Sequence, residues 1–95
     1  MERIGKIVDK TIDDLGLRKG MQEVASMQLW PKIAGNVIAE KTRPAKVRGS
    51  KLWVEVSSSV WMSELVYWKP RLISRINKVL GEEVIKDIIF VNKGE

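Results

Sequence analysis

The chain has 95 residues, of which 44% are hydrophobic and 31% are charged, a size and balance typical of one soluble globular domain. It contains no cysteine and no histidine. These absences exclude disulfide bonds, metal sites built on thiolates or imidazoles, and the Ser-His and Cys-His pairs of nucleophilic catalysis. We therefore expect a protein that is not an enzyme and that holds no metal and no cofactor.

The sequence also indicates in which compartment of the cell the protein lies. Its longest run without a charged residue has eight residues, whereas a transmembrane helix needs about 20 consecutive apolar residues. The first residues, Met1-Glu2-Arg3-Ile4, lack the apolar block of a secretory signal. We therefore expect no membrane segment and a cytoplasmic protein.

The first part of the chain shows two helical patterns. Apolar residues recur at helical spacing over residues 2–16, which predicts a short amphipathic helix. After a joint at residues 16–20, a longer apolar stripe covers residues 21–38. Pro31 lacks an amide hydrogen and disfavours helical angles at Trp30, so we expect a kink or a break there. Trp30 itself is expected to anchor the core.

The pattern then changes to alternation on both sides of Gly49-Ser50, which predicts a β-hairpin with a two-residue turn. The turn implies a register that pairs Val47 with Leu52 on the core face. In the same register Ala45 pairs with Val54. The opposite face then presents a tryptophan among basic residues, which are Lys46, Arg48, Lys51 and Trp53.

The last part of the chain predicts helix and strand. Ser57-Ser58-Ser59 supplies hydroxyl groups that can cap a helix, whose apolar pattern covers residues 61–80 and ends at Gly81. Pro70 interrupts this pattern, so either one helix kinks there or two helices meet there. The β-branched run at residues 84–91 predicts a third strand.

These elements predict an α+β fold in two layers, with helices on one face of a three-stranded sheet formed by the hairpin and the C-terminal strand. Residues 1–95 are expected to form a single domain. The other face of the sheet should remain open and present Ile89 and Val91 beside the outward residues of the hairpin.

The net charge of +5 is concentrated in two segments without acidic residues, because residues 41–54 hold five basic residues and residues 65–81 hold four. Such segregation is typical of a surface that binds a polyanion, although a solvated basic surface without a partner gives the same pattern. The candidate nucleic-acid contacts are the basic residues of both segments and two aromatic residues: Lys41, Arg43, Lys46, Arg48, Lys51, Trp53, Tyr67, Lys69, Arg71, Arg75 and Lys78. For Trp53, an edge or dimer contact is an equal alternative.

Several motifs resemble those of a known bacterial family. They are Trp30-Pro31-Lys32-Ile33-Ala34-Gly35, Leu52-Trp53-Val54, the segment from Ser58 to Leu65, and Arg75-Ile76-Asn77 before Leu80-Gly81. Over about residues 20–92 the chain resembles the DciA family of bacterial replicative-helicase loaders. The resemblance implies a KH-like fold with a type II-like order, a role in DNA replication, the replicative helicase as a partner and affinity for single-stranded DNA.

The chain departs from a type II KH domain at one place. Such a domain grips nucleic acid with a Gly-x-x-Gly loop between adjacent helices, and here that position reads Trp68-Lys69-Pro70-Arg71. The favoured hypothesis is an adaptor that binds DNA and helps to load the helicase. A protein-interaction module and an RNA-binding KH-like module, neither with a helicase role, are the alternatives.

Overall fold

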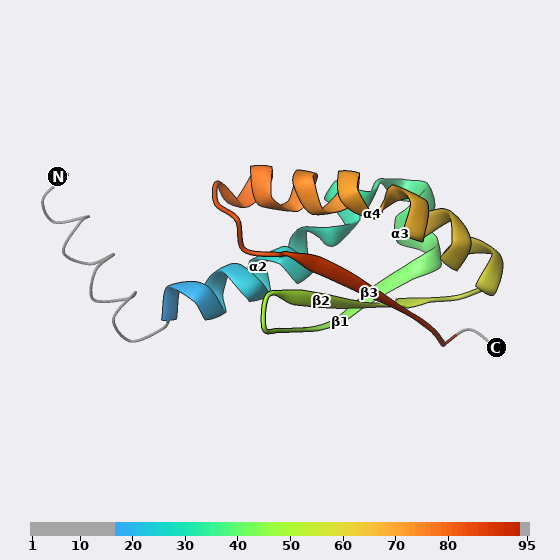
Figure 1. Cartoon of the computed structure of the whole chain (residues 1–95), viewed down its shortest axis with the longest axis horizontal. Coiled ribbons are helices and arrows are strands. Elements are labelled where there is room, and N and C mark those ends of the chain that lie inside the picture. The colour runs from blue at the N-terminus through green and yellow to red at the C-terminus, as the bar shows by residue number, and fades with distance from the viewer. Residues whose placement is uncertain (1–16, 94–95) are drawn as a thin grey trace, which may run out of the picture.

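A computed structural model describes residues 17–93, which form a layer of helices and a layer of sheet (Figure 1). The sheet contains β1 (Thr42–Arg48), β2 (Lys51–Val56) and β3 (Asp87–Asn92) in the order β1-β2-β3. β1 and β2 are antiparallel, whereas β2 and β3 are parallel. The α+β fold with a three-stranded sheet is therefore confirmed. The helix predicted over residues 2–16 lies outside the described residues.

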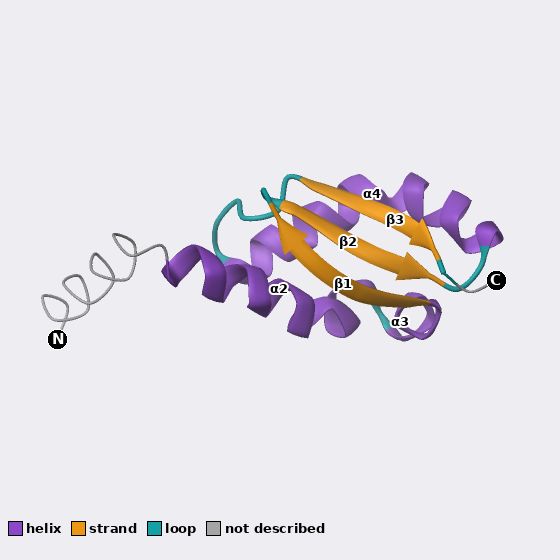
Figure 2. Cartoon of the chain, turned by 90° about the horizontal axis from the view of Figure 1, so that it is seen from below, coloured by secondary structure: helices purple, strands orange, loops and turns teal. Residues whose placement is uncertain are grey.

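The helical layer contains α2 (Leu17–Ala34), α3 (Asn36–Lys41) and α4 (Ser59–Leu80). Seen from below, the sheet lies in front of α4, and none of the described helices crosses the face turned to the viewer (Figure 2). Among the described residues, neither long helix has the apolar length that crossing a bilayer would require.

The hairpin forms as predicted at its turn and differs at its far end. Gly49 and Ser50 have φ angles of 59° and 64°, the left-handed values that a two-residue type I′ turn needs. Val47 pairs with Leu52. The predicted partner of Val54, however, is wrong: the register shifts between Pro44 and Lys46, so Pro44 opposes Val54 and Ala45 is exposed. Proline cannot donate to the ladder and favours bulges on edge strands, and β1 is an edge strand.

The first long helix continues through Pro31, so of the kink or break predicted at Trp30-Pro31, the break is wrong. The helix ends instead at Gly35, whose φ of 89° suits glycine and whose N–H donates to the Pro31 carbonyl at 3.1 Å. Pro31 removes one intrahelical hydrogen bond, but burial of the neighbouring Trp30 holds the helix in place. Residues 17–20 are also helical, so the predicted joint is wrong over that part.

The second long helix is one element, which decides between the alternatives at Pro70. Its N-cap is Ser58, whose Oγ accepts a hydrogen bond from the Trp61 N–H at 3.3 Å. It ends at Gly81, which has a left-handed φ of 82°. Residues 68–71 therefore lie inside a helix, and no loop stands where a type II KH domain has its Gly-x-x-Gly segment.

The core lies between α4 and the sheet and is closed by the C-terminal end of α2. The three alternate residues of β2 that face it are less than 2% exposed. Trp61 and Trp68, which belong to the apolar pattern of residues 61–80 and would be core residues on that pattern alone, are half-buried at the margin of the core. The buried apolar residues are Trp30, Ile33, Ala34, Leu52, Val54, Val56, Leu65, Leu72, Ile76, Val84, Ile85 and Ile88.

The third strand begins at Asp87 and not at Val84, because Val84 and Ile85 belong to the loop that leads into it. The half-buried Asn77 of α4 holds this loop. Its Nδ2 donates to the Ile85 carbonyl at 2.8 Å, and its Oδ1 accepts from the N–H groups of Val84 and Ile85 at 3.0 and 2.9 Å. These three hydrogen bonds, which we call the Asn77 clasp, satisfy backbone N–H and C=O groups of the loop that no helix or strand pairs. They also direct β3 into the sheet beside β2.

Candidate nucleic-acid interface

The open face of the sheet is built from three rows of side chains that cross the strands. Alternate residues of a strand point to opposite faces, so the burial of Leu52, Val54 and Val56 turns the residues between them outward. From the turn onward, the rows are Arg48, Lys51 and Asp87, then Lys46, Trp53 and Ile89, then Arg43, Glu55 and Val91.

Trp53 occupies the centre of this face and is half-buried. The Nζ of Lys46 lies 4.9 Å from the centroid of the Trp53 ring, within the range of a cation–π contact. Ile89 is its neighbour on the parallel strand. The predicted outward direction of Trp53 is therefore confirmed, and its ring is partly covered by its own neighbours.

Four basic residues and two acidic residues lie on the open face. Asp87 forms an ion pair of 3.2 Å with Lys69 and accepts the Ile88 N–H at 2.8 Å. Burial raises the pKa of Asp87, but the hydrogen bonds from Lys69 and the Ile88 N–H and the charges of Lys69 and Lys51 outweigh it, so the pKa is lowered. Asp87 thus stays ionised and is balanced by Lys69, which leaves the face with an excess of positive charge.

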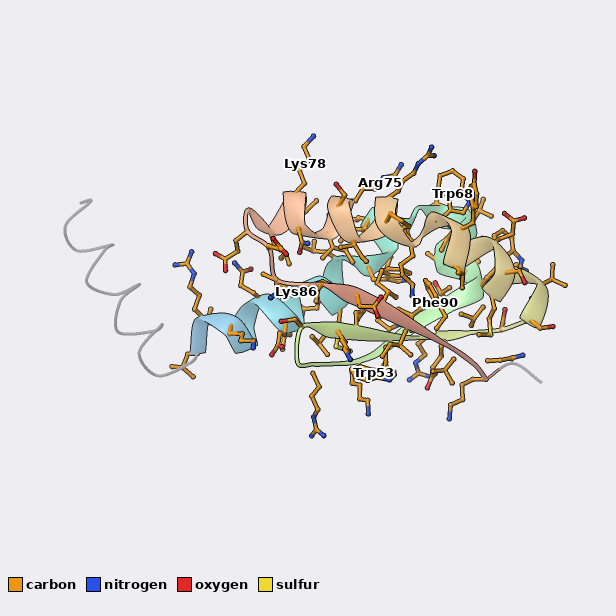
Figure 3. The ribbon with its side chains drawn as sticks, in the orientation of Figure 1. Trp53, Trp68, Arg75, Lys78, Lys86 and Phe90 are labelled. Carbon is orange, nitrogen blue, oxygen red and sulfur yellow. The ribbon has the colours of Figure 1, made fainter. Side chains whose placement is uncertain are left out.

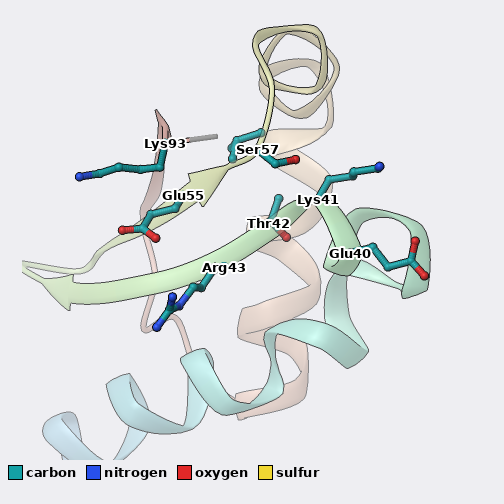
Figure 4. A pocket seen from close by; sticks show the side chains of 8 residues that line it. Glu40, Lys41, Thr42, Arg43, Glu55, Ser57 and Lys93 are labelled. Atoms are coloured by element: carbon teal, nitrogen blue, oxygen red, sulfur yellow. The ribbon is translucent and has the colours of Figure 1, made fainter. Parts of the chain in front are cut away.

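A shallow hollow of about 220 Å³ lies at the end of the open face, where α3 meets β1 (Figure 4). Lys41, Arg43 and Lys93 all line it. The charge pattern of the sequence does not indicate Lys93, because residues 82–95 hold more acidic than basic residues. The parallel β2–β3 pairing places Lys93 here, since its N–H donates to the Val56 carbonyl at 3.0 Å. The lining residues are Glu40, Lys41, Thr42, Arg43, Glu55, Val56, Ser57 and Lys93.

Three of the four basic residues of the second segment, Arg71, Arg75 and Lys78, lie on the other side of the molecule, so the two segments do not form one surface. Figure 3 shows Trp68, Arg75 and Lys78 on the outer side of α4 and Trp53 on the opposite side of the molecule. The reason is that α4 buries its apolar stripe against the sheet, which turns Arg71, Arg75 and Lys78 away from the open face. Lys69 is the exception, because it forms the ion pair with Asp87 on the edge strand β3.

The candidate residues of α4 have other contacts. The Arg71 guanidinium lies 4.8 Å from the centroid of the Trp68 ring, and Arg75 Nη1 donates to the Ile33 carbonyl at 3.3 Å. Tyr67 is 80% exposed and follows the buried Leu65 by two residues, so it lies on the far side of the helix from the core. The structure therefore does not bring Tyr67 to Trp53.

The geometry defines a small α+β sandwich with one sheet face covered by helices and one open, mainly basic face. The family model described as Dna[CI] antecedent, DciA, matches residues 3–90. The chain therefore belongs to the DciA family, as its motifs indicated. A curated relative, the UPF0232 protein of Corynebacterium glutamicum (strain R), is 23% identical over 87 residues, which make up 92% of this chain and 49% of that protein. The chain thus spans about half the length of that relative.

Proposed function

We propose that the chain is a non-catalytic adaptor that binds single-stranded DNA through its open sheet face and helps to place the replicative helicase on DNA. Membership of the DciA family supports the association with the helicase. The observation that carries the DNA-binding half is the row formed by Lys46 and Trp53, with further cations on both sides of it along β1.

The arrangement separates the two tasks of binding a single strand. β1 presents cations at the edge of the sheet, and alternate residues of a strand lie about 7 Å apart, so Lys46 and Arg48 can follow a phosphate backbone. Trp53 on the central strand offers an aromatic ring on which a base can stack. A base on the side of the ring that Lys46 covers would displace the ammonium group toward a phosphate.

One observation favours a different use of the same face. Ile89 and Val91 continue from Trp53 as a half-buried apolar strip on β3, and such a strip also suits contact with a protein. The first two experiments below distinguish these functions.

Binding to an oligothymidylate should be weak and should fall steeply with salt. The open face has four cations, and each phosphate contact on a single strand contributes about −0.7 to the slope of log affinity against log salt. We expect a slope near −3 (about four times −0.7) by fluorescence anisotropy at several salt concentrations. No detectable binding at low salt would favour the protein-interaction function, and tighter binding of oligouridylate would favour RNA.

Replacing Trp53 by alanine should weaken oligothymidylate binding by about 1–3 kcal/mol, the typical contribution of one stacked base. The ring is half-buried, so we expect a stability loss of about 1–2 kcal/mol, more than at a fully exposed site. Anisotropy and thermal melting measure the two effects on the same samples.

Trp53→Phe keeps an aromatic face and should retain most of the affinity. Tyr67→Ala removes an 80% exposed ring from the other side of the molecule and should leave DNA binding unchanged. If Trp53→Ala bound DNA normally but lost the purified helicase, the open face would be a protein contact and the DNA-binding proposal would fail.

A further inference from the structure

The outer surface between α2 and α4 carries a groove that the DNA-binding proposal does not use. Its volume is about 330 Å³. Ile33 is its buried floor, Leu29 is half-buried and Val79 is 57% exposed. Lys32 from α2 and Arg75 from α4 complete the lining. The groove is therefore apolar inside and positively charged at its rim.

A second hollow continues this groove along α4 and shares Arg75 with it. Arg71 and Lys78 line this hollow, and residues 65–81 contain no acidic residue. Figure 3 shows Arg75 and Lys78 on the outer side of the helix. The hydrogen bond from Arg75 to the Ile33 carbonyl joins the two helices across the groove, so the guanidinium is held in place before any partner arrives.

We propose that this groove binds an acidic amphipathic helix of a protein partner. An amphipathic helix inserts apolar side chains at positions i, i+3 or i+4, and i+7 into such a groove. Leu29, Ile33 and Val79 offer the apolar contact, and glutamate or aspartate side chains flanking the apolar stripe would meet the cations of the rim.

The same features argue against nucleic acid as the occupant. A phosphate backbone gains nothing from an apolar floor, and bases bind single-strand sites largely by stacking on aromatic rings. No aromatic residue lines the groove, and Arg71 packs on the ring of the nearby Trp68. Because the groove and the open sheet face lie on opposite sides of the molecule, the two surfaces can be occupied at the same time.

The test uses the full chain and a synthetic helical peptide that carries leucines at i, i+4 and i+7 flanked by glutamates. Amide resonances are followed by NMR during titration. We expect saturable shifts around Leu29, Ile33 and Val79, and no such shifts with the same peptide in which lysines replace the glutamates. The double substitution Lys32→Glu and Lys78→Glu should weaken binding by about tenfold or more, because two attractive contacts become repulsive.

A pair of valine variants tests the apolar half of the proposal. Val79→Ser should weaken peptide binding by about tenfold, whereas Val66→Ser, at a site 55% exposed on the same helix and outside the groove, should change it less than about twofold. Both sites are exposed, so both variants should fold.

Two results would overturn the inference. One is the absence of saturable shifts near the groove at millimolar acidic peptide. The other is that oligothymidylate shifts the groove resonances and the peptide does not, which would make the groove a nucleic-acid surface. Oligothymidylate shifts confined to the open sheet face would support both this inference and the DNA-binding proposal, and their absence would affect only the latter.

Discussion

Replacing Trp30 by alanine should lower the free energy of unfolding by about 3–5 kcal/mol, a large part of the 5–15 kcal/mol that such a domain has in total. The side chain is 1% exposed between the helices and the sheet, so its removal leaves a cavity. The substitution also interrupts two consecutive hydrogen bonds, because Trp30 Nε1 donates to Thr42 Oγ1 at 2.8 Å and that hydroxyl donates to the Ile38 carbonyl at 2.7 Å. Urea denaturation followed by circular dichroism measures the loss.

Trp61→Ala is the matched control. The apolar pattern alone predicts the same loss of about 3–5 kcal/mol for both tryptophans, but Trp61 is half-buried at the margin of the core. We therefore expect a smaller loss of about 1–3 kcal/mol for Trp61→Ala. Equal losses at the two sites, or a Trp30→Ala variant that unfolds within a few degrees of the parent, would contradict the core described above.

Asn77→Ala should lower the free energy of unfolding by about 2–4 kcal/mol, because part-buried groups that lose their partners carry a desolvation penalty. The substitution removes all three hydrogen bonds between α4 and the loop before β3. Amide hydrogen exchange should also accelerate in β3 more than in β1, since the loop directs β3 into the sheet.

Asn77→Asp separates the acceptor from the donor. It keeps an oxygen for the N–H groups of Val84 and Ile85 and loses the donor to the Ile85 carbonyl, so we expect about half of the alanine effect. If Asn77→Ala kept parent-like stability and β3 exchange, the Asn77 clasp would have no structural importance. The DNA-binding proposal would then lose one of its structural arguments, which is that a firmly held β3 keeps Ile89 beside the Trp53 ring.

The elements that sequence predicts well depend on neighbours along the chain. Gly49 and Ser50 reach left-handed angles that a type I′ turn requires, and the alternation beside them leaves one register that buries Leu52. Ser58 and Gly81 bound α4 through contacts within a few residues of each helix end. Each of these signals is complete within one short segment.

The prolines show where local signals fail. Pro31 and Pro70 each weaken a helix by about 3 kcal/mol in isolation, yet both lie inside continuous helices. Burial of Trp30, which precedes Pro31, and of Leu72, two residues after Pro70, offsets the missing hydrogen bond in each helix. In β1, by contrast, a proline does disturb the regular structure, since Pro44 lies beside a bulge that exposes Ala45.

The candidate site also has features that the sequence predicts and features that only tertiary packing decides. Sequence alone identified the cations and placed Trp53 opposite the core, because alternation within one strand settles the side on which a residue lies. It could not place the basic segment of α4, whose direction depends on how Leu65 and Ile76 pack against the sheet. Nor could it place Lys93 in the hollow at the end of the open face or form the groove between α2 and α4, because these depend on packing between segments distant in the chain.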